Sequence, residues 1–221
     1  MNICRITSAF PPPWNGLAPG PYGLSLAQQG RGISVTVIAR ETPGAGEVDA
    51  KTPFPVERVP ASYDIQFSLR ASMRFKALES RGHRPFDIVH GHGLSALGFL
   101  ISKKMGALSV PVVTTFHCVR RTQRRFAREA LKTHGNGSEV KKIVPSRLRL
   151  ACEAFQERLV AGGSDGLIAV SEEIRKNLID GYGVSPGKVF MPGNGVDAAL
   201  FSPAEKGPLN AGSRINLLWV G

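Results

Sequence analysis

The sequence predicts an α/β protein with a Rossmann-like, doubly wound parallel sheet. Short apolar segments alternate with helical segments, and several apolar segments are continuous, which is typical of strands covered on both faces. The chain has 221 residues, of which 42% are hydrophobic, so it is long enough to bury one sizeable core. Ligands of such sheets bind at the carboxyl ends of the strands, and candidate functional residues are therefore expected there.

Six segments have the β-branched and apolar composition of strands, with Gly, Pro or polar residues near their ends. They are residues 2–7, 34–39, 86–90, 110–116, 166–170 and 188–191. Helices are predicted where an amphipathic segment is followed by glycines that favour helix termination. They are residues 22–29, 94–105 and 171–180, with Ser171 as the expected N-cap of the last.

Three features of the sequence predict the cellular compartment of the protein: its N-terminus, its hydropathy and its cysteines. Residues 1–10 contain Arg5 in an apolar run too short for the core of a signal peptide. No run of about 18 apolar residues is present, as a membrane-spanning helix would require. Cys4, Cys118 and Cys152 are isolated, without the C-x-x-C spacing of zinc or redox sites. These features predict a cytoplasmic protein with reduced thiols.

The net charge of +11 is concentrated in one segment. Residues 119–149 contain ten Lys and Arg and two Glu, a net +8, which leaves +3 for the rest of the chain. Such a segment favours an anionic partner, whether a phosphorylated substrate, anionic lipids at a membrane surface or nucleic acid. The alternative is a basic face that contacts only water.

The loop after the first predicted strand, residues 8–22, is rich in proline and glycine. Gly16 allows the backbone to approach a ligand, and the following helix directs its N-terminus to the same place, an arrangement that attracts phosphate. The same composition also fits a rigid connection with no ligand.

Residues 87–96 contain Gly91-x-Gly93-x-x-Ala96, which imitates the dinucleotide fingerprint. That fingerprint needs an acidic residue about 20 positions later, and residues 88–128 contain none. His90 and His92, with His117, also suggest a metal site, but no carboxylate or cysteine pair completes it. Histidines at strand ends that bond to nearby loops and line a cleft are the more ordinary interpretation.

His117 follows the predicted strand 110–116, at the carboxyl end of a central strand. A histidine there can donate to a bound anion or hydroxyl and can change its charge near neutral pH. The alternative is a buried histidine that bonds to a backbone carbonyl.

Seven motifs appear in the order and spacing of one known family. They are Pro12-Pro-Trp-Asn-Gly16, residues 26–37, Phe86-Asp-Ile-Val-His-Gly-His92, Val113-Thr-Thr-Phe-His117, Ala169-Val-Ser-Glu-Glu173, Lys188-Val189 and Asn194-Gly-Val-Asp197. Together they resemble the N-terminal domain of family 4 glycosyltransferases, which have the GT-B architecture. The resemblance covers nearly the whole chain.

The resemblance implies transfer of a sugar from a UDP- or GDP-linked donor, with retention of configuration and without a metal or other cofactor. No D-x-D metal motif is present in the sequence. The resemblance assigns donor binding to Asn15 and Gly16, where the family usually has Gly-Gly, so altered donor geometry is expected. It assigns the catalytic contact with the donor sugar to His117. Asn194, Gly195 and Asp197 correspond to the hinge region.

The family resemblance also implies a division into domains. Residues 1–203 are expected to form the acceptor-side domain, 204–214 a linker, and 215–221 the first strand of a missing nucleotide-sugar domain. A chain without that domain is expected to be inactive. The acceptor side gives the basic segment a role: holding an anionic or lipid-linked acceptor, with peripheral contact at the inner face of the membrane. The candidate residues are His92, Arg120, Arg121, Arg124 and Arg125, with Tyr63 and Lys76 as weaker candidates.

Two other classes of protein share some of these features. A sugar-nucleotide epimerase has the same general fold but needs acid and base carboxylates in its cleft, and residues 88–128 supply none. A nucleic-acid-binding module would explain the charge, but aromatic stacking platforms near the basic run are few, so nucleic acid is an unlikely partner.

Replacing Arg120, Arg121, Arg124 and Arg125 together with Gln is expected to weaken binding of an anionic acceptor or of anionic vesicles at low salt. The loss should shrink as salt rises, because exposed charges are screened over about 8 Å at physiological ionic strength. Vesicle co-sedimentation and acceptor titration at several salt concentrations measure it. Equal binding by parent and variant at low salt would show that the segment is only a solvated face.

Overall fold

The computed structural model describes residues 1–80, 85–120, 122, 147–196 and 198. Their strands are β1 (Asn2–Thr7), β2 (Ser34–Arg40), β3 (Val56–Val59), β4 (Ile88–His92), β5 (Val112–Phe116), β6 (Gly166–Ala169) and β7 (Val189–Phe190). Their α-helices are α1 (Pro19–Gln29), α2 (Ala45–Asp49), α3 (Asp64–Ser80), α4 (Leu97–Lys104), α7 (Arg147–Gly163) and α8 (Glu172–Lys176). Short 3₁₀ turns are η1 (Gly93–Ala96) and η3 (Pro186–Lys188), and η2 (Asn177–Gly181) is a π-helical turn.

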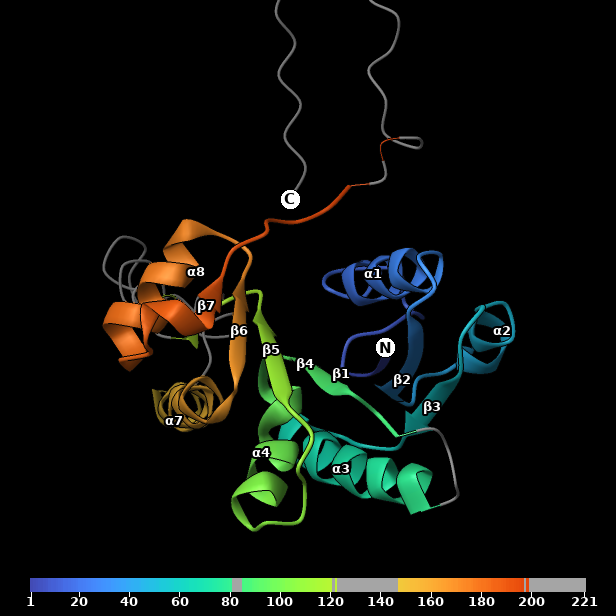
Figure 1. Ribbon diagram of the computed structural model, residues 1–221, viewed down its shortest axis with the longest axis horizontal. Helices are drawn as coiled ribbons and strands as arrows, with labels where there is room; N and C mark the ends of the chain where they lie inside the picture. The colour runs from blue at the N-terminus through green and yellow to red at the C-terminus, as the bar shows by residue number, and fades with distance from the viewer. Residues whose placement is uncertain (81–84, 121, 123–146, 197, 199–221) are drawn as a thin grey trace, which may run out of the picture.

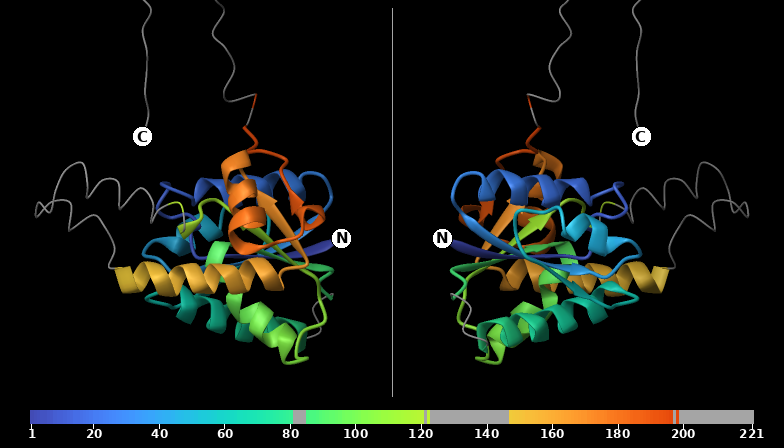
Figure 2. Two further views of the ribbon diagram at one scale, coloured as in Figure 1. Left: turned by 90° about the vertical axis from the view of Figure 1, so that its left-hand side faces the viewer. Right: turned by 90° about the vertical axis from the view of Figure 1, so that its right-hand side faces the viewer.

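The described strands form one parallel sheet in the order β3-β2-β1-β4-β5-β6-β7. Helices α3, α4 and α7 lie on one face of the sheet, and α1 lies on the other (Figure 1). Ile174 of α8 belongs to the same core as the buried residues of α7. The side views show α7 lying along the same side of the sheet as α3 (Figure 2). This arrangement confirms the predicted doubly wound α/β fold. None of the helices described is both long and apolar enough to cross a membrane.

Two apolar cores follow from the alternation of side chains along the strands. Cys4, Ile6 and Ile38 belong to the larger core, which includes residues of α3, α4 and α7. Val35 and Val37 point to the opposite face and join a smaller core beneath α1. Consecutive residues of a strand therefore contact different helical layers, and the position of a residue in the strand determines which layer its side chain contacts.

The six predicted strands are confirmed, with ends displaced by up to two residues. The third predicted strand, residues 86–90, corresponds to β4, which begins at Ile88 and ends at His92. The predicted helices are also present, and the Ser171 hydroxyl accepts from Ile174 N at 3.3 Å as an N-cap. Strand β3 and helices α2, α3 and α7 were not predicted from the sequence. Strand β3 has four residues, two of them Glu57 and Arg58, because an edge strand needs no continuous apolar run.

Helices α3 and α4 pack with almost no space between their backbones at Gly98. A Cβ at Gly98 would lie 2.4 Å from the Ser68 carbonyl oxygen and 3.0 Å from Leu69 Cα. The Ser68 hydroxyl accepts from Gly98 N at 2.5 Å and donates to Ser95 O at 3.1 Å. Any side chain at position 98 would therefore push the two helices apart.

Gly98→Ala is expected to lower the free energy of unfolding by about 1–3 kcal/mol, because the obstructing atoms belong to the backbone. Gly23→Ala is the matched control, since Gly23 is also helical but has no atom within 4 Å of an added Cβ. That control should be neutral or raise stability by up to about 1 kcal/mol. Urea denaturation compares them, and equal stabilities would contradict the tight packing.

Candidate functional site

The direction of chain connection reverses between β1 and β4. From β1 the chain passes to β2 on one side, whereas from β4 it passes to β5 on the other. The loops that leave β1 and β4 are therefore neighbours, and Ser8 N donates to the Ser95 hydroxyl at 3.1 Å. A crevice at such a switch point, outside the carboxyl ends of the strands, is where α/β sheets of this kind bind ligands.

The loop after β1 carries the two predicted donor-binding residues. Gly16 has φ +54°, a conformation that favours glycine, and no atom lies within 4 Å of where its Cβ would be. Among the described residues, no residue other than glycine has positive φ, so Asn15 is not strained by replacing a glycine. The Trp14 ring packs on Tyr22 of α1, with centroids 4.8 Å apart. The loop therefore turns with Gly16 toward open space.

Strand register aligns a row of polar side chains on the α1 face of the sheet. Arg5 of β1 is opposite His90 of β4, and His92 of β4 is opposite Thr115 of β5. Side chains two residues apart share a face, so His117 continues the row just beyond β5. The row therefore leads from the centre of the sheet to the carboxyl edge.

Ring contacts and hydrogen bonds connect the members of this row. His90 and His92 stack with centroids 4.9 Å apart, and His92 and His117 stack with centroids 5.3 Å apart. Arg5 Nη1 lies 3.3 Å from His90 Nδ1 and 3.1 Å from His92 Nε2. His92 Nδ1 lies 3.0 Å from His117 Nε2, and His90 Nε2 lies 2.7 Å from Thr115 Oγ1.

Arg5 is a fully buried cation with uncharged neighbours. Its side chain is 0% exposed, and its Nη2 donates to Gln28 Oε1 on α1. Among the described residues its Nε has no hydrogen-bond partner. Burial lowers the pKa of Arg5 to about 10. The guanidinium is still charged at neutral pH, so the groups that bond to it must act as hydrogen-bond acceptors.

The histidines beside Arg5 are held neutral. Burial, reinforced by the charges of Arg5 and His117, lowers the pKa of His90 to about 3. Burial and the neighbouring charges place the pKa of His92 well below its usual range. His117 is half-buried, and burial lowers its pKa as well. The predicted catalytic residue is thus the accessible end of a buried, neutral network.

The described members of the predicted acceptor set have different surroundings in the structure. His92 is 9% exposed, and both of its ring nitrogens are engaged, so its ring has none to offer an acceptor. In this geometry His92 belongs to the network behind His117. The Arg120 side chain pairs with Glu153 of α7 at 2.9 Å. Three further predicted acceptor residues, Arg121, Arg124 and Arg125, lie outside the described residues.

The histidine row does not have the arrangement of a metal centre. Five of the six ring nitrogens of the three histidines are engaged with Arg5, Thr115 or one another. In the described part of the chain, no group of three His, Cys, Asp or Glu could hold a metal ion. The row is better described as a hydrogen-bonded stack around a buried cation.

A cavity of about 460 Å³ lies where α3 begins, beside η1 and the first turns of α7. Two ion pairs border it: Arg40 with Asp64 at 2.5 Å, and Arg149 with Glu153 at 2.8 Å. Tyr63, a weaker candidate in the sequence analysis, also lines it and is 59% exposed. Lys76 is exposed on α3 and does not line it. The cavity walls thus carry cations whose partners are carboxylates.

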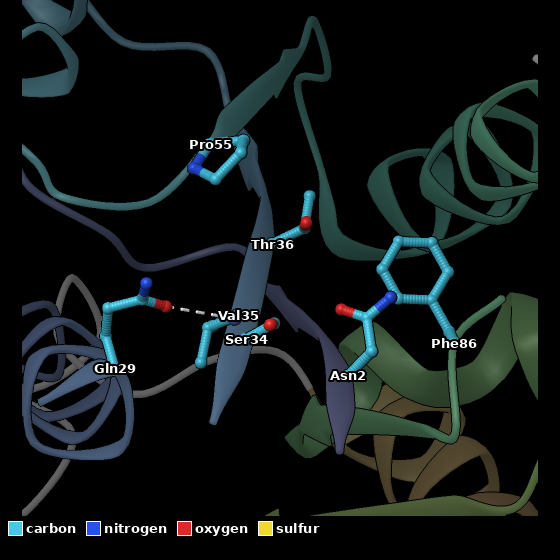
Figure 3. A pocket seen from close by; sticks show the side chains of 7 residues that line it. All are labelled: Asn2, Gln29, Ser34, Val35, Thr36, Pro55 and Phe86. Atoms are coloured by element: carbon cyan, nitrogen blue, oxygen red, sulfur yellow. Dashed lines mark hydrogen bonds between the residues drawn. The ribbon is translucent and has the colours of Figure 1, made fainter. Parts of the chain in front are cut away.

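A smaller cavity, of about 280 Å³, lies at the other end of the strands, where β1 and β2 begin (Figure 3). Asn2 and Ser34 begin their strands there, and Gln29 Oε1 accepts from Val35 N at 3.2 Å. The Asn2 amide is also engaged, because its Nδ2 donates to Pro85 O at 3.2 Å. This cavity is at the amino ends of the strands and is remote from the switch point.

The predicted hinge lies at the end of the described chain. Asn194 and Gly195 are exposed and follow β7, with Gly193 at φ +79° just before them. Asp197, the predicted linker 204–214 and the predicted strand 215–221 lie outside the described residues.

Stability is expected to fall on acidification below pH about 6.5. Between the folded pKa of His90, about 3, and its unfolded value, about 6.5, the unfolded chain binds a proton that the folded chain does not. Each such histidine contributes a slope of up to about 1.4 kcal/mol per pH unit, with stability rising as pH rises. Urea denaturation from pH 7.5 to 5 measures the slope.

His90→Asn isolates this contribution, because Asn Oδ1 can accept from Arg5 in place of Nδ1 but does not titrate. The variant should show a smaller pH slope than the parent. An identical slope would mean that His90 is not held neutral by the fold.

The chain spans about half the length of the curated relatives that it matches. It is 29% identical over 232 residues to a D-inositol 3-phosphate glycosyltransferase from Kineococcus radiotolerans, covering 96% of this chain and 48% of that protein. A second relative of the same name, from Nocardioides sp., is 25% identical over 227 residues and covers 93% and 44%.

Solved structures share the fold at low identity. A glycosyltransferase from Rickettsia africae has 16% identity and a TM-score of 0.56, covering 94% of this chain and 46% of that one. Anabaena HepE, solved with UDP and glucose, has 14% identity and a TM-score of 0.56, covering 93% and 47%. A UDP-N-acetylglucosamine 2-epimerase from Rickettsia bellii has 14% identity and a TM-score of 0.53, covering 88% and 45%.

The fold is therefore shared by transferases and epimerases, and the similarity of the sequence to known families distinguishes between the two classes. The family model for Glycosyltransferase Family 4 matches residues 14–200, and the curated relatives are glycosyltransferases. The fold is that of the N-terminal half of the GT-B architecture. The chain belongs to glycosyltransferase family 4.

Proposed function

We propose that this chain is the acceptor-side half of a retaining glycosyltransferase that needs no metal and moves a sugar from a UDP- or GDP-linked donor to an anionic acceptor. The observation that carries the proposal is the position of His117. His117 follows β5 at the carboxyl edge of the sheet, and β5 is the neighbour of β4 at the switch point. His117 is also the accessible end of the buried row. Retention and metal independence rest on the family resemblance.

The donor side of the proposal rests on the charge of the leaving group. A nucleoside diphosphate gains negative charge as the glycosidic bond breaks, and N–H donors in fixed positions stabilise that charge. Gly16 can expose its backbone N–H because no side chain covers it, and His117 supplies a ring nitrogen. Anabaena HepE, which shares the fold, was solved with UDP and glucose, and this supports a nucleotide-sugar donor.

The acceptor side rests on chemistry and on the relatives' names. The matched curated relatives act on D-inositol 3-phosphate, a polyol that carries a phosphate. The cavity of about 460 Å³ has Arg40 and Arg149 in its wall, and a phosphate could compete with their carboxylate partners. The net +8 of residues 119–149 adds attraction for the same kind of group, or for anionic lipids at the inner face of a membrane.

The remaining parts of the proposal concern the whole protein. The relatives are about twice as long as this chain, which leaves room for a nucleotide-binding domain after the region of Asn194 and Gly195. We propose that the whole enzyme is cytoplasmic and that its two domains close around the donor. We also propose that residues 1–221 alone do not catalyse the transfer.

His117→Ala, in a protein that carries both domains, is expected to lower kcat by about 10² to 10³, because a donor to the transition state is lost. Acceptor binding should change little. The assay incubates UDP- or GDP-sugars with D-inositol 3-phosphate or unphosphorylated inositol and detects the product by mass spectrometry, with and without a chelator.

Cys118→Ala is the matched control, because it removes the neighbouring half-buried side chain and should leave kcat near that of the parent. An unchanged kcat in His117→Ala would show that the histidine is structural. Interconversion of the sugar nucleotide without transfer would favour the epimerase class instead.

A further inference from the structure

The direction of every hydrogen bond in the histidine row follows from Arg5. A guanidinium has five N–H donors and no acceptor, so any ring nitrogen that bonds to it must be unprotonated. Arg5 Nη1 carries two hydrogens and faces two ring nitrogens, His90 Nδ1 at 3.3 Å and His92 Nε2 at 3.1 Å. Both nitrogens are therefore acceptors.

The proton of each ring must then be on its other nitrogen. In His90 the remaining nitrogen, Nε2, lies 2.7 Å from Thr115 Oγ1 and donates to it. In His92 the remaining nitrogen, Nδ1, lies 3.0 Å from His117 Nε2 and donates to that atom. The branch through His90 ends at a buried hydroxyl, whereas the branch through His92 continues to the carboxyl edge.

The last acceptor in the second branch is His117 Nε2. If that atom carried a proton, it would have to donate to His92 Nδ1, and His92 would then accept at both nitrogens with no place for its own ring proton. His117 must therefore carry its proton on Nδ1 when neutral. In the described part of the chain, His117 Nδ1 has no hydrogen-bond partner, and the side chain is half-buried.

We propose that Arg5 is a positioning residue that acts through His92 to hold His117 as the neutral Nδ1–H tautomer, with that N–H available at the carboxyl edge of the sheet. The assignment rests on donor and acceptor geometry and needs no ligand. The network also explains why an arginine occupies a fully buried position on the interior strand β1, 0% exposed and without a carboxylate partner within hydrogen-bond distance among the described residues.

The consequence for catalysis rests on the proposed function. Because Nε2 of His117 is occupied, the ring can donate from Nδ1 but cannot take up a second proton without breaking its bond to His92. His117 then acts as a neutral donor to an oxygen of the donor sugar or its diphosphate, and not as a general base. Burial, which lowers the pKa of His117, agrees with this role.

Nitrogen NMR of the chain tests the proposal without a substrate. The chain is labelled with ¹⁵N, and two-bond ¹H–¹⁵N correlations distinguish protonated from unprotonated ring nitrogens at pH 7.5. A His117→Gln variant assigns the signals. The expected result for the parent is a protonated Nδ1 and an unprotonated Nε2 in His117, and the reverse tautomer would overturn the proposal.

Two variants test whether Arg5 is the cause. Arg5→Met removes the donor while keeping an extended apolar side chain, and His117 should shift toward the Nε2–H form that free imidazole favours. His92→Met replaces the ring with a side chain that has no N–H donor to offer His117, so it should give the same shift. The second variant answers the question if Arg5→Met does not fold.

Thr115→Val is the matched control. It breaks the His90 branch but leaves the line from Arg5 through His92 to His117, so the tautomer of His117 should not change. If His117 keeps Nδ1–H in a folded Arg5→Met or His92→Met variant, or loses it in Thr115→Val, then Arg5 does not set the tautomer through His92. The spectra do not depend on turnover, so this failure is distinct from an absence of transferase activity.

Discussion

The burial of Arg5 in the middle of the sheet constrains the site more than any other contact. An unpaired charge inside a protein costs several kcal/mol, and carboxylates usually provide the compensation. Here the described partners of the guanidinium are Gln28 and two neutral histidines, on α1 and β4. These partners must remain acceptors for the charge to be tolerated, so their protonation is fixed by the fold.

That constraint joins the packing of the domain to its chemistry. Gln28 holds α1 against β1, and α1 follows the loop that carries Gly16. His92 extends the same bonds to His117, which follows β5. The two elements proposed to face the donor thus have a common internal anchor. Rigid first contacts supported by a second layer of hydrogen bonds are the usual requirement for stabilising a developing charge.

The opposite face of the sheet carries the acceptor half of the proposal. There α3 and α4 pack so closely at Gly98 that no side chain is tolerated, and α7 lies beside them. The cavity with Arg40 and Arg149 in its wall is formed where α3 begins and α7 passes. A helical layer therefore positions cations near the carboxyl edge, while the row on the other face positions His117, the proposed catalytic residue.

The sequence by itself determined the fold class, the places of six strands, the position of His117 at a strand end and the family. These features are local: strand composition, glycine at Gly16 and short motifs are decided within a few residues. β3 was not predicted, because an edge strand can be short and charged. α3 was also not predicted, although Phe67, Ala71 and Phe75 have the i, i+4, i+8 spacing of an amphipathic helix and the sequence therefore carries a signal for it.

Only the tertiary structure decided the role of Arg5 and His92. The available signal was an arginine inside an otherwise apolar strand, but its partners are 85 and 87 residues away in sequence. They meet because β4 pairs with β1 in a register that sets His90 opposite Arg5, and because β5 places Thr115 opposite His92. Strand order and register are long-range properties, and a shift of one residue would have turned each of these side chains to the other face.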